Sequence, residues 1–225
     1  MKRMSEAEKK AWANVAKAAN VKSNKHIDDV YTEWSKVYDD DVITTGYCTP
    51  DNLVGKMMKY VNNSPTSQIL DIGAGTGKCG EVLKKQGFKG IIDALDINRA
   101  MLDVARSKFI YRGHYNIGVF PDKPIPLEYG LYDAVICAGT MMSGHMEPEC
   151  VTPLVRALKP GGYALWNIRH TDHENEYKYR MEKTLDELVK EAEIEKIEEK
   201  LMQHCAVEFS VGNKLMAIIY VYRKL

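Results

Sequence analysis

The sequence predicts an α/β protein, in which a mostly parallel sheet carries helices on both faces and follows a helical cap. Short apolar stretches alternate with helical stretches from residue 68 onward, and strands separated by helices form parallel sheets covered on both faces. Before that point, only helical patterns occur. We therefore expect residues 1–64 to form an N-terminal cap or lid and residues 65–225 to form the core, within one compact domain.

The cap is expected to contain three helices, over residues 5–20, 27–38 and 49–61. Ser5 and Glu8 have the spacing of a capping box, which marks the start of the first helix. In the second helix, periodicity brings Tyr31, Trp34 and Tyr38 to one face. Such a face is more typical of packing than of an aromatic cage.

The core is expected to alternate strands and helices. The strand candidates are residues 68–71, 90–96, 115–119, 131–137 and 162–168. Helical stretches cover residues 77–86, 98–108, 147–158 and 174–192. Residues 193–202 fit either the end of a helix or a strand, and "KLMAIIYVYRK" predicts a final strand.

Composition narrows the possible partners and compartments. The 31 basic residues balance the 31 acidic ones, which argues against a nucleic-acid partner because such proteins carry a basic excess. The five cysteines show neither CxxC spacing nor an even count, so we expect a reducing, cytoplasmic location and no zinc site. No apolar run approaches the length of a membrane span, and the charged N-terminus lacks a secretory signal pattern. We expect neither a membrane partner nor a bound metal.

The stretch "LDIGAGTGKCG" contains glycines at 73, 75 and 77 and suggests a nucleotide-binding loop. A phosphate-binding P-loop would need glycine where Ile72 stands and a hydroxyl where Cys79 stands. The sequence therefore lacks two residues that a P-loop needs to bind phosphate and magnesium. A dinucleotide loop would need its third glycine at the position of Lys78, so NAD fits poorly and remains an alternative.

S-adenosylmethionine fits this loop better. Asp71 ends the first strand, and Gly73, Gly75 and Gly77 would let the backbone approach a ligand that has no phosphate groups. We expect Asp71 to supply negative charge near the ligand's ammonium group, directly or through water.

The second strand supplies another expected cofactor contact. Asp96 stands at its end, where an acid can accept hydrogen bonds from ribose hydroxyls. The neighbouring Ile97 is placed to cover an adenine face. The alternative is that Asp96 only caps the helix that begins near Asn98.

With these motifs in order, residues 26–225 resemble the class I S-adenosylmethionine-dependent methyltransferases. "LDIGAGTG", "ALDINRAML", "LYDAVICAG" and "LKPGGYALW" are similar to four successive motifs of that superfamily. The resemblance implies a Rossmann-like sheet of seven strands, with the last strand antiparallel and inserted beside the fifth. More narrowly, "VYTEWSKVYDDDV", "GYCTP" and "IIYVYRK" resemble the methyltransferase-like proteins named for the Williams–Beuren syndrome region.

The resemblance also implies further cofactor contacts. Many superfamily members place an acid after the third strand to bind the adenine amine, whereas this chain has Val119 and Phe120 there and Asp122 slightly later. Adenine recognition is thus assigned to backbone amides or to Asp122. Tyr38 and Tyr47 resemble residues of the lid that covers the cofactor in related enzymes.

The methyl acceptor is expected at the carboxyl ends of the fourth and fifth strands, which border the usual ligand crevice. His145 follows the fourth strand and could act as a general base or contact the acceptor. Alternatively, it only lines the pocket or caps the next helix. Arg169 ends the fifth strand and could bind an acceptor carboxylate or phosphate, or could make an internal ion pair.

The sequence therefore predicts a cytoplasmic, small-molecule methyltransferase that transfers a methyl group to N or O and releases S-adenosylhomocysteine. A monomer or a homodimer is compatible with it. Two alternatives remain: a methyltransferase acting on protein or RNA, and a non-catalytic module that only binds S-adenosylmethionine.

Overall fold

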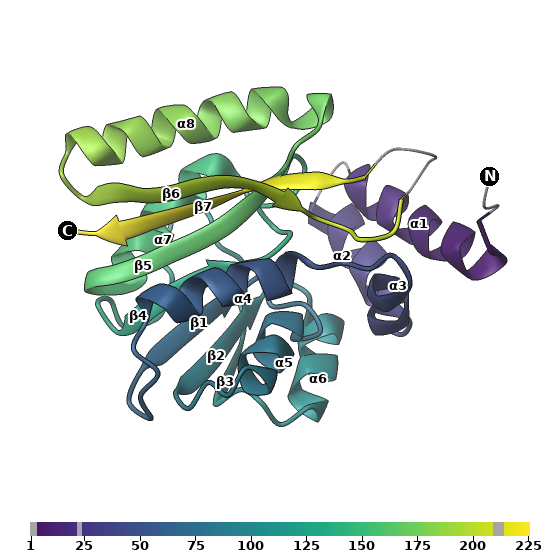
Figure 1. The fold of residues 1–225 in the computed structure, drawn as a ribbon, viewed down its shortest axis with the longest axis horizontal. Helices are drawn as coiled ribbons and strands as arrows, with labels where there is room; N and C mark the ends of the chain where they lie inside the picture. Colours follow the sequence, from purple (N-terminus) through teal and green to yellow (C-terminus); the bar gives the residue numbers. More distant parts are fainter. Residues whose placement is uncertain (1–3, 22–23, 209–213) are drawn as a thin grey trace.

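The computed structural model describes residues 4–21, 24–208 and 214–225 (Figure 1). Its sheet has seven strands in the order β3-β2-β1-β4-β5-β7-β6. They are β1 (Gln68–Ile72), β2 (Ile91–Asp96), β3 (Gly113–Asn116), β4 (Tyr132–Cys137), β5 (Leu158–Arg169), β6 (Ile194–Gln203) and β7 (Met216–Lys224). Strand β7 is antiparallel to both of its neighbours, β5 and β6. The expected seven-stranded topology, with the last strand inserted beside the fifth, is confirmed.

Helices cover both faces of this sheet. In the described residues, they are α1 (Glu6–Ala19), α2 (Asn24–Trp34), α3 (Tyr38–Thr44), α4 (Thr49–Tyr60), α5 (Lys78–Lys85), α6 (Arg99–Ser107), α7 (Val151–Ala157) and α8 (Asn175–Lys190). Short 3-10 helices cover Pro148–Cys150 and Asp172–Glu174. No helix within these residues is long and apolar enough to cross a membrane.

The alternation of side chains along the strands divides the core into two layers. Leu70 and Ile72 of β1 pack with residues of α7 and α8, whereas Ile69 packs with residues of α4, α5 and α6. Successive strand residues point to opposite faces, so a strand that is buried on both faces reads as a continuous apolar run. This explains why the strands were recognisable in the sequence.

The cap departs from the expected helix over residues 27–38. The chain bends after Trp34 and begins a new helix, α3, at Tyr38. Three consecutive acids, Asp39 to Asp41, occupy the first turn of α3, where negative charge is favoured by the helix dipole. The buried Asp41 accepts hydrogen bonds from Trp34 Nε1 (2.8 Å) and from Asn14 Nδ2 of α1 (2.7 Å). Hydrogen bonds to Asp41 thus link the three helices α1, α2 and α3 within the cap.

One strand ends earlier than expected, and the segment left open between helix and strand forms a strand. Strand β3 ends at Asn116 rather than near residue 119, because Ile117 and Val119 pack into the core from a loop that borders the site described below. Residues 194–203, which were ambiguous, form the edge strand β6. Its Ile197 and Leu201 are exposed, so neither serves as a core residue.

The cap lies at one end of the sheet, and the C-terminus lies at the other (Figure 1). The parallel strands β1, β2 and β4 run toward the cap, so their carboxyl ends face α2 and α3. Ligands of open α/β sheets bind at this edge.

Candidate cofactor and acceptor site

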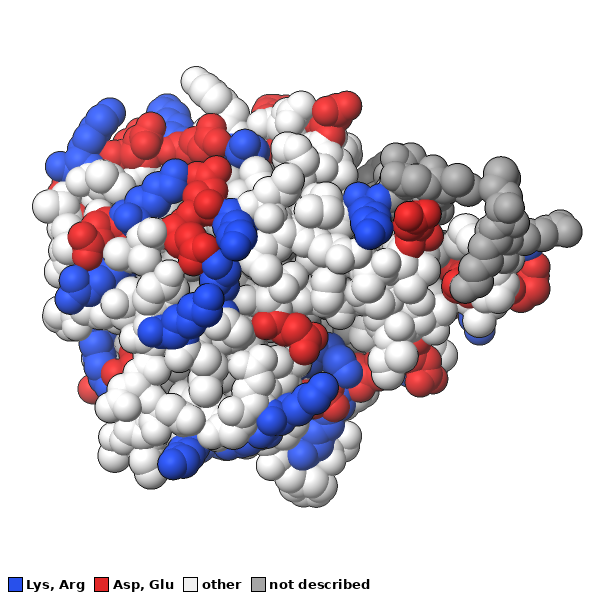
Figure 2. Space-filling view, viewed as in Figure 1, with Lys and Arg blue, Asp and Glu red and all other residues white. Residues whose placement is uncertain are grey.

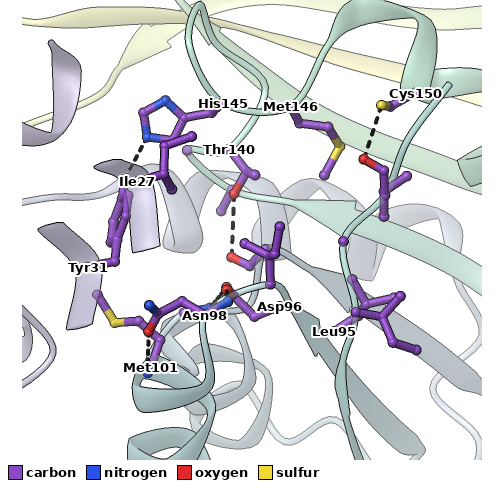
Figure 3. A pocket seen from close by; sticks show the side chains of 18 of the residues that line it. Ile27, Tyr31, Leu95, Asp96, Asn98, Met101, Thr140, His145, Met146 and Cys150 are labelled. Carbon is purple, nitrogen blue, oxygen red and sulfur yellow. Dashed lines mark hydrogen bonds between the residues drawn. The ribbon is translucent and has the colours of Figure 1, made fainter. Parts of the chain in front are cut away.

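A cavity of about 270 Å³ lies between the carboxyl ends of the strands and the cap. Figure 3 shows side chains from both parts converging on it. Of the residues expected to form the site, six line this cavity: Tyr38, Gly73, Gly75, Asp96, Ile97 and His145. The structure therefore brings together residues that are more than a hundred positions apart in the sequence.

The glycine loop after β1 forms one edge of the cavity. Gly75 has a φ of +55° and no atom within 4 Å of where a Cβ would be, so the left-handed backbone conformation explains this glycine. A Cβ on Gly73 would instead lie 2.1 Å from Thr140 Oγ1. Gly77 does not line the cavity and lies at the start of α5. The loop thus presents backbone, rather than side chains, to the cavity.

Asp96 is the only buried carboxylate among the residues that line this cavity. Its Oδ2 accepts a hydrogen bond from Gly75 N–H and its Oδ1 accepts one from Asn98 N–H, both at 2.8 Å. Burial raises its pKa to about 6, against the lowering effect of these two bonds. A carboxylate has about four acceptor positions, so two remain for a ligand.

The cap of the following helix is Asn98, not Asp96. Asn98 Oδ1 accepts a hydrogen bond from Met101 N–H at 2.9 Å. Its Nδ2 donates to Asp28 Oδ1 (2.8 Å) and Thr32 Oγ1 (2.9 Å), both on α2. That Asn98 also bonds to α2 was not predicted from the sequence. Its role as a helix cap could have been predicted, because asparagine is favoured at the start of a helix. Asn98 joins the cap to the core beside Asp96.

Asp71 does not line the cavity. Its carboxyl group is buried, and its Oδ2 accepts a hydrogen bond from Tyr111 O–H at 2.7 Å. Burial raises its pKa to about 7, opposed by the Tyr111 bond and reinforced by the charge of Asp96. This geometry offers no direct contact between Asp71 and a ligand's ammonium group. It leaves only an indirect effect, through the loop that Asp71 supports or through its charge.

Asp122 also lies outside the cavity lining, because it is exposed in a turn after the cavity-lining segment 117–121. The apolar wall there is made by Phe120 and Ile97. A Cβ on Gly118 would lie 2.8 Å from the Phe120 ring and 3.0 Å from Ile97 Cδ1. A side chain at Gly118 would therefore displace the Phe120 ring and the end of Ile97.

His145 lies at the cap side of the cavity, where its Nε2 is 2.9 Å from Tyr31 O–H of α2 (Figure 3). Its Nδ1 faces the carbonyl oxygen of Ser143 at 3.4 Å. Because a carbonyl can only accept, Nδ1 carries the proton and Nε2 accepts from Tyr31. Burial lowers the pKa of His145 to about 4, opposed by the Ser143 bond and reinforced by the positive charge of Arg169. The imidazole is therefore neutral near pH 7.

Tyr47 and Arg169 line a second, smaller cavity of about 70 Å³. The two cavities share Tyr31, Tyr38 and Gly139 in their linings. Arg169 does make the internal ion pair that the sequence left open, with its Nη2 2.8 Å from Glu174 Oε1.

Hydrogen bonds from core residues to Asp39 connect α3 to the core. Asp39 accepts hydrogen bonds from Oγ1 of Thr76, which lies within the glycine loop (2.6 Å), and from Lys108 Nζ (2.5 Å). These long-range partners could not be read from sequence spacing. Among the described residues, no group of three or more His, Cys, Asp or Glu side chains is arranged to hold a metal ion.

Comparison with known proteins finds similarity to methyltransferases. Residues 69–162 match the methyltransferase domain family. Methyltransferase-like protein 27 from Homo sapiens is 30% identical over 159 residues, which are 70% of this chain and 64% of that protein. The ubiquinone/menaquinone biosynthesis C-methyltransferase UbiE from Wigglesworthia glossinidia brevipalpis is 30% identical over 64% of this chain and 59% of its own length.

The chain thus spans about three fifths of the length of these two curated relatives. Among solved structures, the SAM-dependent methyltransferase from Aquifex aeolicus superposes with a TM-score of 0.53. It has 17% sequence identity, with 84% of this chain and 97% of that chain covered. At this level of identity the likeness concerns the fold.

Proposed function

We propose that this chain, which belongs to the class I S-adenosylmethionine-dependent methyltransferases, binds S-adenosylmethionine in the larger cavity and methylates a nitrogen or oxygen atom of a small molecule. The observation that carries the proposal is Asp96. It is a buried carboxylate at the end of β2, held by two backbone N–H groups and facing a cavity at the carboxyl edge of the sheet. Ribose hydroxyls can donate to its two remaining acceptor positions.

The rest of the cavity suits the other parts of this cofactor. Ile97 and Phe120 form an apolar wall suited to the adenine ring. Gly73 and Gly75 offer exposed backbone to the amino-acid end, which carries no phosphate group. When bound, S-adenosylmethionine supplies an activated methyl group on a sulfonium centre. The chain's own task is then to align the acceptor with that group and to exclude water.

His145 is the residue that we assign to the acceptor's proton. The single acceptor nitrogen of its neutral imidazole, Nε2, accepts from Tyr31 O–H. The acceptor's proton would therefore pass to the Tyr31 oxygen as the Tyr31 proton moves to Nε2. A pKa of about 4 makes His145 a weak base in the protein alone. A negative charge bound nearby would raise that pKa and improve proton uptake, because it stabilises the imidazolium.

A small-molecule acceptor is supported by the cap. Helices α2 and α3 cover the cavity and are tied to the core through Asn98 and Asp39, which leaves little room for a polymer. Figure 2 shows basic and acidic side chains interspersed on the visible face. The name of the UbiE relative also indicates a small-molecule pathway for that protein. We infer, in addition, a cytoplasmic enzyme of small-molecule metabolism, monomeric or homodimeric, in keeping with five free cysteines.

The proposal is tested by incubating the protein and methyl-labelled S-adenosylmethionine separately with three pools from a cell extract: small molecules, proteins and RNA. We expect label in a low-molecular-mass product and none with the Asp96→Ala variant. Label in protein or RNA would contradict the small-molecule assignment. Cofactor binding without labelled product from any of the three pools would favour the non-catalytic module.

A further inference from the structure

The second cavity adjoins the larger one and has a different chemical character. Tyr31, Tyr38 and Gly139 line both cavities and therefore form the boundary between them. The smaller cavity lies where α1, α2 and α3 meet the ends of β5 and β6. A group held there would be next to whatever occupies the larger cavity.

Aromatic rings make up much of its wall. Trp34 packs against Tyr31 and Tyr38, with ring centroids 5.8 and 4.7 Å apart. Tyr47 completes this wall, with its hydroxyl against Gly139, where a Cβ would lie 2.5 Å from the Tyr47 oxygen. Gly139 also has a φ of +73°, so a side chain there would be strained and would displace Tyr47. The boundary between the two cavities therefore requires glycine at position 139.

Of the described residues that line this cavity, only Arg169 is charged at neutral pH. Its side chain is only 12% exposed and is anchored by the bond from Nη2 to Glu174 Oε1. Its Nε–H is buried and has no hydrogen-bond partner among the described residues. A buried donor without a partner is energetically unfavourable, by about 1–3 kcal/mol. The guanidinium group of Arg169 thus lines the cavity with part of its hydrogen-bonding capacity unused.

The partner carboxylate, Glu174, offsets this positive charge in part, but Arg169 is the member of the pair that lines the cavity. Glu174 is not among the lining residues, and its other oxygen, Oε2, accepts a hydrogen bond from Ser143 N–H at 2.9 Å. On the far wall, burial and then the positive charge of Arg169 lower the pKa of His204 to about 3. His204 is therefore neutral and bonded through Nδ1 to Thr49 Oγ1. The aromatic wall thus encloses a positive charge, which opposes a cationic ligand.

The size of the cavity limits what can enter. A cavity of about 150 Å³ accommodates benzene, whereas this one measures about 70 Å³. A carboxylate on a short apolar stem is of suitable size. The remainder of the molecule would pass Gly139 toward the larger cavity.

We propose that the second cavity is the acceptor subsite and that it takes a carboxylate on a short aliphatic stem, bound by the guanidinium group of Arg169. This rests on the proposed function, because the methyl donor must lie in the larger cavity. It places the reacting nitrogen or oxygen beyond Gly139, beside Tyr31 and His145. The bound carboxylate also supplies the negative charge that would raise the pKa of His145.

Binding of three matched probes tests this subsite without measuring activity. Propanoate, propanamide and propylammonium are similar in size and differ in charge. The readout is the indole N–H resonance of Trp34, assigned with Trp34→Phe, while the resonance of the buried Trp166 in β5 serves as an internal reference. We expect propanoate to shift the Trp34 resonance saturably and to bind roughly tenfold more tightly than propanamide, as for loss of a charged hydrogen-bond partner. Equal binding of the amide, a preference for propylammonium, or no propanoate-dependent shift would overturn the proposal.

Variants identify the group responsible. Arg169→Gln should weaken propanoate binding roughly tenfold or more. Because it leaves Glu174 unpaired, the double variant Arg169→Gln/Glu174→Gln is measured as well and should show the same loss. Arg180→Gln, which removes an arginine of α8 that pairs with Glu149 of the 3-10 helix Pro148–Cys150, should bind propanoate normally. Unchanged binding in the double variant would contradict the assignment.

Titration of S-adenosylhomocysteine into the same samples separates the two proposals. Cofactor binding without propanoate binding rejects the subsite and leaves the proposed function intact. Failure of both rejects the proposed function as well.

Discussion

The two walls of the larger cavity are built differently. On the core side, backbone groups dominate: Gly73 N–H and Ala74 N–H donate to the Leu95 carbonyl at 2.8 and 3.1 Å, and Gly75 N–H donates to Asp96. On the cap side, the contacts are made by side chains, chiefly Asn98 and Tyr31. Backbone contacts tolerate many sequences, whereas side-chain contacts depend on residue identity.

This difference between the walls separates a cofactor site that many enzymes could share from an acceptor site that is specific to this chain. The core wall has the form that a shared cofactor requires, and its pattern is recognisable from the glycine loop onward. The cap wall contains Tyr31 and Tyr38 and continues into the second cavity, which is also lined by Trp34 and by Arg169 from β5. We therefore expect the core wall to determine cofactor binding and the cap wall to determine the acceptor. The following predictions test whether the two can be separated.

The largest effect is expected at the core wall. Asp96→Ala removes the acceptor for both ribose hydroxyls and also releases Gly75 and Asn98. Two hydrogen bonds to a charged group correspond to a loss of roughly 100-fold or more in affinity for S-adenosylhomocysteine. Equilibrium dialysis measures it. Asp103→Ala, an exposed acid on the neighbouring α6, is the matched control, and an equal loss in that variant would show a nonspecific effect.

A similar loss, in turnover rather than affinity, is expected at the cap wall. His145→Gln keeps a hydrogen-bonding group near Tyr31 but cannot take up the acceptor's proton. General bases contribute at least about 100-fold, so kcat should fall by about that factor in the labelled-methyl assay. The affinity for S-adenosylhomocysteine should stay within about twofold. A normal kcat would restrict His145 to lining the pocket.

Breaking the junction between the walls should lower stability. Asn98→Ala removes the cap of α6 and both side-chain bonds to α2. We expect a loss of about 2 kcal/mol in the free energy of unfolding, from one lost cap and unpaired polar groups. Chemical denaturation measures this loss. Asn116→Ala, which removes side-chain bonds at the end of β3 instead, should destabilise less. A reversed order would mean that the cap contributes little.

The smallest effect concerns pH. Asp96 has a pKa raised to about 6 by burial, and its ionised form is the better acceptor for ribose hydroxyls. Cofactor affinity should therefore be constant above about pH 7 and fall toward tenfold per pH unit well below pH 6. Calorimetric titrations between pH 5 and 8 measure it. An affinity independent of pH would indicate that Asp96 does not bind the ribose.

The sequence predicted the core wall better than the cap wall. Gly73, Gly75, Asp96 and Ile97 lie within 25 positions of one another and follow recognisable strands. Asp71 fits the same pattern, but its orientation toward Tyr111, forty residues away, is decided by packing.

The cap could be predicted only in part. Its helices were recognisable, yet the bend after Trp34 depends on Asp41 receiving bonds from two other helices. Likewise, the pairing of Tyr31 with His145 joins residues 114 positions apart. Such contacts have no local pattern, because they arise when the cap folds onto the core.

Calorimetric titration of S-adenosylhomocysteine into the wild-type protein, with NAD as the competing ligand, tests the central claim most directly. We predict saturable binding of one S-adenosylhomocysteine per chain and no heat of binding from NAD. Binding of NAD together with no binding of S-adenosylhomocysteine would contradict the assignment of the cavity at Asp96.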